Sequence, residues 1–141
     1  MSAYGYPIDI QHEGPLFRVI FPDFDATETY GESRETALDA AVDLLETMIS
    51  ARIAEGLELP VPSPAHRRHV VQLSPMTALK AAIHQTMHTH DISHAELARR
   101  LGWQEIQVDH LTDPRHPSRL DQLESALTAL GRRIVITVSA A

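Results

Sequence analysis

Alternating apolar and polar residues in the first part of the chain predict a small antiparallel sheet. Residues 4–11 form the first expected strand, residues 16–21 the second and residues 26–30 a weaker third. The sequence Glu13-Gly14-Pro15 between the first two strands is typical of a hairpin turn. A short strand at residues 69–73 could extend the same sheet.

A long amphipathic helix is predicted between the third and fourth strands. Ser33 is a suitable N-cap residue, because its hydroxyl can accept a hydrogen bond from an unpaired amide of the first turn. The apolar residues of the helix recur at spacings of three and four: Leu38, Ala41, Val42, Leu45, Met48, Ile49 and Ile53. This stripe can pack on the sheet, which predicts a β-β-β-α-β domain and an α+β fold class.

Helical periodicity dominates the second half of the chain. Residues 59–64 are rich in proline and are expected to form a semi-rigid connector. Ser74 and Pro75 then begin a helix with the apolar residues Met76, Leu79, Ala82, Ile83 and Met87. A last helix follows Pro117 and Ser118, with the apolar residues Leu120, Leu123, Leu127 and Leu130.

Residues 92–111, between these helices, predict two short helices joined by a glycine turn. Ser93 and Glu96 match the capping-box pattern, and Gly102 can adopt the positive φ that ends a helix. The second short helix is expected at about residues 104–112, anchored by Ile106, Val108 and Leu111. This arrangement is the helix-turn-helix pattern, in which the second helix enters a DNA major groove.

The chain after the last helix, residues 132–138, has the β-branched composition of a strand. Nothing near it in the sequence could pair with it, and an unpaired strand is usually covered or added to another sheet. We therefore expect dimerisation or higher oligomerisation through this segment, with the contacts made by Ile134, Val135, Ile136 and Val138.

The charge of the 141-residue chain is divided unevenly. Residues 1–73 carry 12 acidic side chains and 5 arginines, a net charge of −7, whereas residues 74–141 carry 7 of each sign and are neutral. The first part should therefore favour a basic partner, and the second can tolerate a polyanion. The chain has no cysteine, no apolar run long enough to span a bilayer and no signal-peptide pattern, so we expect a cytoplasmic protein with no membrane partner.

Candidate enzymatic and metal sites are weaker than the helix-turn-helix pattern. His84 and His88 share a helix face, but the segment HQTMH has glutamine where a zinc protease places its general-base glutamate. Four carboxylates could suggest two-metal hydrolysis, although an acidic surface shows the same residues: Asp9, Asp23, Asp25 and Glu28. A nucleophile elbow and a phosphate-binding glycine loop are both absent from the sequence. We therefore expect no catalytic residue, no metal site and no cofactor, and keep a metal-dependent nuclease as a remote alternative.

The expected DNA contacts follow from the helix-turn-helix pattern. Arginines near the predicted groove helix are the candidate phosphate contacts, because Glu105 and Asp109 would be repelled by phosphate. Glutamate can instead accept from cytosine, and glutamine can pair with adenine. The expected DNA-binding residues are Arg99, Arg100, Gln104, Glu105, Gln107, His110, Arg115, Ser118 and Arg119.

The order of these segments resembles the HicB antitoxins of bacterial HicAB toxin–antitoxin systems. The likeness is carried, in order, by YPIDI, FRVIFPDF, TYGESRETALDAAVDLLETMI, EGLELPVPSP, ELARRLG and ALTALGRRI. It implies an N-terminal domain at residues 1–73, similar to a partial RNase H fold without activity, that binds and masks a small, basic, mRNA-cleaving HicA toxin. It further implies a C-terminal domain at residues 74–141 that binds operator DNA, represses its own operon and forms a dimer or tetramer.

The resemblance places the toxin-facing turn at Asp23, Phe24 and Asp25. Here the sequence departs from the family, which often has Pro-Gly-Cys where this chain has Asp25-Ala26-Thr27. The main alternative function is a stand-alone transcriptional regulator whose N-terminal domain senses a small ligand.

Overall fold

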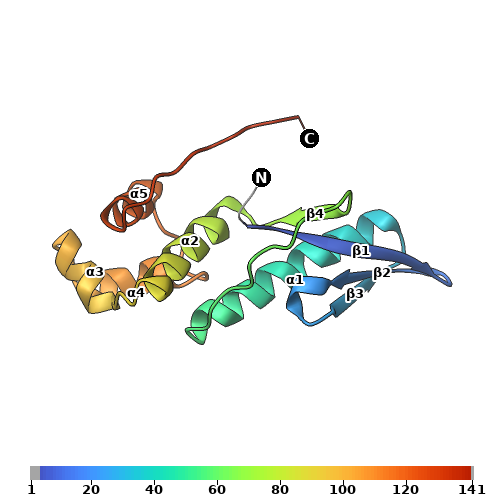
Figure 1. Ribbon diagram of the computed structural model, residues 1–141, viewed down its shortest axis with the longest axis horizontal. Helices are drawn as coiled ribbons and strands as arrows, with labels where there is room; N and C mark the ends of the chain where they lie inside the picture. Colours follow the sequence, from blue (N-terminus) through green and yellow to red (C-terminus); the bar gives the residue numbers. More distant parts are fainter. Residues whose placement is uncertain (1–3, 141) are drawn as a thin grey trace.

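The computed structural model describes residues 4–140, which form a sheet part and a helical part at opposite ends of the long axis (Figure 1). The sheet part has four antiparallel strands in the spatial order β3-β2-β1-β4: β1 (Gly5–Glu13), β2 (Leu16–Phe21), β3 (Thr27–Gly31) and β4 (His69–Gln72). A short 3-10 helix, η1 (Pro22–Phe24), connects β2 to β3. β4 pairs with β1, so the prediction that the late strand extends the first sheet is confirmed.

Helix α1 (Arg34–Ala54) packs on the sheet and contributes five buried residues to the core between them. Ser33 Oγ accepts from the amide of Thr36 at 3.1 Å, and Thr36 Oγ1 accepts from the amide of Ser33 at 3.0 Å, so Ser33 is the predicted N-cap. Gly31 lets β3 turn directly into this helix, because a Cβ atom there would overlap the backbone of Ala37. The buried residues recur every four positions: Ala37, Ala41, Leu45, Ile49 and Ile53. Val42 lies beside this stripe and is exposed, contrary to the prediction.

The helical part consists of α2 (Pro75–Thr89), α3 (His94–Leu101), α4 (Glu105–Thr112) and α5 (Leu120–Ala129). Apolar residues from all four helices form a second core: Ile83, Met87, Leu97, Ala98, Val108, Leu111, Leu123, Ala126, Leu127 and Leu130. The mixed α+β class predicted from the sequence is therefore confirmed.

Helix α2 belongs to both cores and connects the two parts. Ala81 lies in the core under the sheet, whereas Ile83 and Met87 lie in the helical core. Polar contacts reinforce this junction, because Gln85 Oε1 accepts from the amide of Leu59 at 3.0 Å and a ring nitrogen of His84 lies 2.6 Å from the Leu57 carbonyl oxygen. The two parts consequently share a helix instead of being joined by a free linker.

Besides Val42, one segment and two apolar residues differ from the prediction. The segment after α5 forms no strand within residues 132–140, because a strand needs a hydrogen-bonded neighbour and none of the described segments pairs with it. Ile106 was expected in the core but is exposed, since α4 buries the face that contains Val108, Leu111 and Thr112. Leu120, expected on the apolar face of the last helix, is exposed as the first residue of α5.

Candidate nucleic-acid and partner interfaces

The turn between α3 and α4 has the geometry expected of a helix-turn-helix. Gly102 adopts φ +69°, and the amide of Trp103 donates to the Ala98 carbonyl at 2.9 Å, which closes α3. At the other end of α3, Ser93 Oγ accepts from the amide of Glu96 at 3.1 Å. The Glu96 carboxylate accepts from Arg99 and Arg100 and does not complete the predicted capping box.

Helix α4 presents a polar face to solvent. Gln107 Oε1 accepts from the amide of Gln104 at 2.9 Å and so caps the first turn, which restricts the freedom of that side chain to pair with a base. Val108, Leu111 and Thr112 are buried in the helical core. The residues of α4 that remain exposed are Glu105, Ile106, Gln107, Asp109 and His110.

A buried lysine holds the C-terminal end of α4 in place. Lys80 of α2 is fully buried, and its ammonium group donates to the carbonyls of His110 at 3.1 Å and Leu111 at 3.0 Å and to Ser118 Oγ at 2.8 Å. All three N–H donors are thereby satisfied, and a cation at a helix C-terminus interacts favourably with the helix dipole. Burial lowers the pKa of Lys80, and the negative charge of Asp113 opposes this shift.

The sequence interpretation missed this contact. Lys80 lies four residues after Met76 and three before Ile83, so it occupies a position of the predicted apolar stripe. A cation on an apolar helix face was therefore the available signal. Its acceptors could not have been named, because they come from residues about 30 positions later in the chain.

The four arginines predicted to contact phosphate differ in whether they already form an ion pair within the protein. Arg99 and Arg100 both pair with Glu96, which lowers the pKa of that carboxyl, and Arg119 pairs with Asp121. Among the described residues, the guanidinium of Arg115 has no ion pair. Three of these four arginines must therefore exchange or share a carboxylate in order to contact phosphate, whereas Arg115 needs no exchange.

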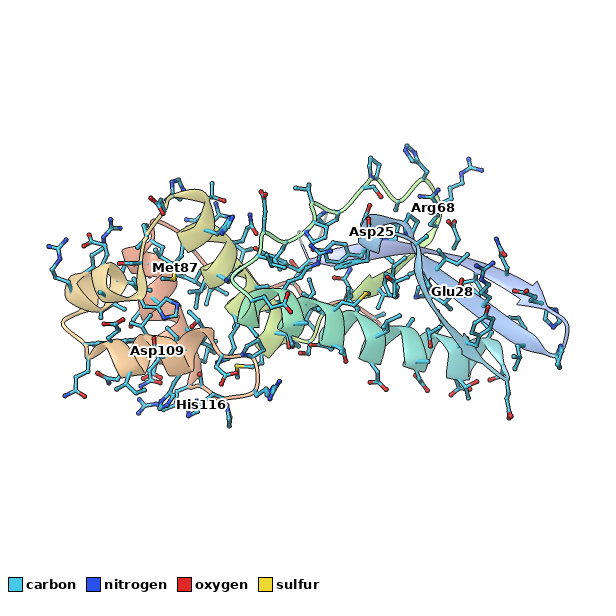
Figure 2. All side chains as sticks on the ribbon, turned by 90° about the horizontal axis from the view of Figure 1, so that it is seen from below. Asp25, Glu28, Arg68, Met87, Asp109 and His116 are labelled. Atoms are coloured by element: carbon cyan, nitrogen blue, oxygen red, sulfur yellow. The ribbon has the colours of Figure 1, made fainter. Side chains whose placement is uncertain are left out.

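One acidic residue of the predicted groove helix, Asp109, contacts a histidine of α3. Asp109 Oδ1 lies 2.6 Å from His94 Nδ1 and so connects α4 to the start of α3. Figure 2 shows Asp109 and His116 on the helical part, far from Asp25 and Glu28. His116 lies in the loop before α5, and its ring stacks on His110 with the centroids 4.3 Å apart.

The predicted toxin-facing residues have three different environments. Phe24 is 2% exposed, and its ring centroid lies 4.9 Å from that of Tyr6 and 6.1 Å from that of Phe21. Asp23 Oδ2 accepts from the amide of Ser63 at 3.0 Å, which fixes the proline-rich connector to η1. Asp25 is exposed and has φ 54°. Of the three side chains, Asp25 is the one free to meet a partner.

An apolar groove of about 470 Å³ runs between the connector and strands β1 and β4. Its lining includes Tyr6, Pro7, Pro60, Val61, Ser63 and Val70. The hydroxyl of Tyr6 donates to the Pro60 carbonyl at 2.7 Å and holds the connector over the strand. Ser63 Oγ is buried without a hydrogen-bond partner among the described atoms.

The histidines considered for metal binding do not form a ligand group. Residues 4–140 contain no cluster of three or more histidine, aspartate or glutamate side chains that could hold a metal ion. A ring nitrogen of His84 is engaged with the Leu57 carbonyl, and burial lowers the pKa of this histidine. No helix within the described residues is long and apolar enough to cross a membrane.

The chain thus combines an acidic four-stranded sheet part with a part made of short helices, and helix α2 belongs to the cores of both. The family model described as "HicB_like antitoxin of bacterial toxin-antitoxin system" matches residues 4–82. The chain belongs to this family, whose members are antitoxins and not enzymes.

Curated relatives extend the similarity beyond the matched domain. Antitoxin HicB of Pseudomonas fluorescens (strain Pf0-1) is 34% identical over 98% of this chain and 96% of the relative. Antitoxin HicB 2 of Photorhabdus laumondii is 32% identical over 92% of both chains, and Antitoxin HicB of Escherichia coli (strain K12) is 27% identical over 86% and 89%. The resemblance inferred from the sequence is therefore confirmed, and the chain is an antitoxin of a toxin–antitoxin system.

Proposed function

We propose that this antitoxin neutralises a small HicA-type, mRNA-cleaving toxin through residues 1–73 and represses its own operon through residues 74–141. The observation that carries the proposal is the division of charge between two differently built parts: the sheet part has a net charge of −7, and the helix-turn-helix part is neutral. An acidic surface accelerates association with a basic toxin and can cover its RNA-binding surface.

Co-expression with a neighbouring gene for a small basic protein tests the neutralisation. The antitoxin should restore growth, and the two proteins should purify together from the native host in affinity purification followed by mass spectrometry. If growth is not restored although both proteins are produced, the HicA-type partner is wrong. Cleavage of RNA by the antitoxin alone would contradict the steric mechanism.

For DNA binding, Arg115→Ala should weaken the complex with the region upstream of the gene in a gel shift. Arg115 is the candidate phosphate contact without a competing carboxylate, so its loss should reduce the slope of log K against log salt by about 1 per protomer. Arg34→Ala, an exposed arginine in α1, is the control and should leave the slope unchanged. An unchanged slope in Arg115→Ala would remove this residue from the DNA interface.

We further propose that two copies associate through their C-terminal segments. Val135, Ile136 and Val138 are 77%, 72% and 90% exposed, and the segment extends away from α5 (Figure 1). Antiparallel pairing of two such segments would satisfy their backbone groups and cover the β-branched side chains. Such an arrangement places two helix-turn-helix units about one axis, as binding to two DNA half-sites requires.

Replacing Ile136 with aspartate should convert the oligomer into monomers. A carboxylate in an apolar strand interface loses its hydration without gaining a partner, which disfavours association. Sedimentation equilibrium measures the result, with Val61→Asp, an exposed β-branched residue outside this segment, as the control that should leave the mass unchanged. An unchanged mass for Ile136→Asp would place the oligomer interface elsewhere.

A ligand-sensing regulator remains the second candidate function, and the apolar groove beside β1 and β4 favours it. A small molecule that purifies with the protein and alters its affinity for the upstream DNA would support this candidate. The variant Val70→Trp should fill the groove with its own side chain. If this variant still protects cells from the toxin, neutralisation does not require a ligand in the groove.

A further inference from the structure

One large apolar side chain on the candidate DNA surface, Ile106, is more than half exposed and lies outside the helical core. Ile106 is the second residue of α4 and is 52% exposed, whereas Val108 and Leu111 of the same helix are buried. The helical core therefore does not require an isoleucine at this position. A branched apolar side chain is therefore available to a ligand at the start of the predicted groove helix.

The neighbours of Ile106 are inconsistent with an apolar protein interface. Asp109 and His110, three and four residues further along the helix, share its face and are exposed and polar. A stable protein contact needs a contiguous apolar patch, and a single isoleucine among polar side chains does not provide one. Double-stranded DNA presents this combination, because the major groove holds polar base edges beside the isolated 5-methyl groups of thymine.

We propose that Ile106 contacts the 5-methyl group of a thymine in the major groove and makes this antitoxin prefer an A·T pair at that position of each half-site. This inference rests on the proposed DNA-binding function. The first residues of a groove helix are those that reach base edges, and Ile106 occupies that part of α4. Gln107 is held by its cap bond to the Gln104 amide, which leaves Ile106 as the exposed side chain of this turn suited to a methyl group.

The test compares two versions of the region upstream of the gene, one prepared with thymine and one with uracil in every thymine position. Uracil keeps the Watson–Crick pairing and lacks only the 5-methyl group. The full-length protein should bind the thymine fragment about tenfold more tightly in a gel shift at fixed salt, which corresponds to about one buried methyl group per half-site. Ile106→Ala should bind the thymine fragment more weakly and show little preference between the two fragments.

Val42→Ala is the matched control, because it shortens an exposed aliphatic side chain on α1, in the sheet part, and should retain the full preference for thymine. Ile106→Val provides a second variant, because it keeps the β-branched shape with a smaller apolar surface, and it should retain part of the preference for thymine. If Ile106→Ala keeps the same preference for thymine as the unmodified protein, the inference is wrong although the proposed DNA binding stands. If the unmodified protein binds neither fragment, the DNA-binding function itself fails, and the inference fails with it.

Discussion

Replacing Lys80 with methionine should lower the free energy of unfolding by about 3 kcal/mol, because it removes every donor from a buried site built around an ammonium group. The carbonyls of His110 and Leu111 and the hydroxyl of Ser118 would lose their common partner. Methionine has a similar length, so the change creates little empty space. Urea denaturation, monitored by the fluorescence of Trp103, measures the free energy of unfolding of the helical part, because Trp103 packs against the helical core.

The same variant should weaken DNA binding by more than its stability loss explains. Lys80 joins the end of α4 to Ser118, next to the candidate phosphate contacts Arg115 and Arg119. Without it the helix and the loop can move independently, so the contacts no longer form as one unit. A gel shift at a temperature where the variant is fully folded should therefore show reduced affinity.

Two companion variants make the Lys80 prediction specific. Ser118→Ala removes one of the three acceptors and should cost about 1 kcal/mol. Arg34→Met replaces an exposed cation of α1 and should change stability by less than about 0.5 kcal/mol. If Lys80→Met is as stable as the unmodified protein and binds DNA equally well, the lysine does not position α4.

The sequence predicted the elements of this fold well where the signal is local. The position of α1 was predicted from its N-cap Ser33 and the apolar stripe that follows. The position of α3 was predicted from its N-cap Ser93 and the turn at Gly102. Each of these signals depends on residues within one or two helical turns, so no tertiary information is needed. The hairpin of β1 and β2 was predicted for the same reason.

The features that the sequence did not predict all depend on contacts between residues far apart in the chain. An eight-residue helix such as α4 has too few apolar positions to define its buried face, and the core selected Val108 and Leu111 over Ile106. The contact of Lys80 with the end of α4 and the pair of His94 with Asp109 join residues 30 and 15 positions apart. The C-terminal segment has strand composition, but a strand exists only with a neighbour, which none of residues 4–140 supplies.

Phe24→Ala should lower the free energy of unfolding by about 3 to 4 kcal/mol, as the loss of a buried aromatic ring in a packed core requires. Its ring lies against Tyr6 and Phe21, and the guanidinium carbon of Arg52 lies 5.4 Å from its centroid. The turn of Asp23, Phe24 and Asp25 was predicted to contact the toxin, but the burial of Phe24 gives it a structural role. Urea denaturation monitored by far-ultraviolet circular dichroism measures this loss.

Stability and toxin neutralisation should separate at this turn. Phe24→Leu keeps most of the apolar volume, should cost less than about 2 kcal/mol and should still restore growth on co-expression with the toxin. Asp25→Asn removes an exposed charge while keeping a residue type that tolerates positive φ, so it should leave stability unchanged and weaken toxin binding. A Phe24→Ala variant that is as stable as the unmodified protein yet fails to protect cells would reverse this assignment, because Phe24 would then act at the toxin interface and not in the core.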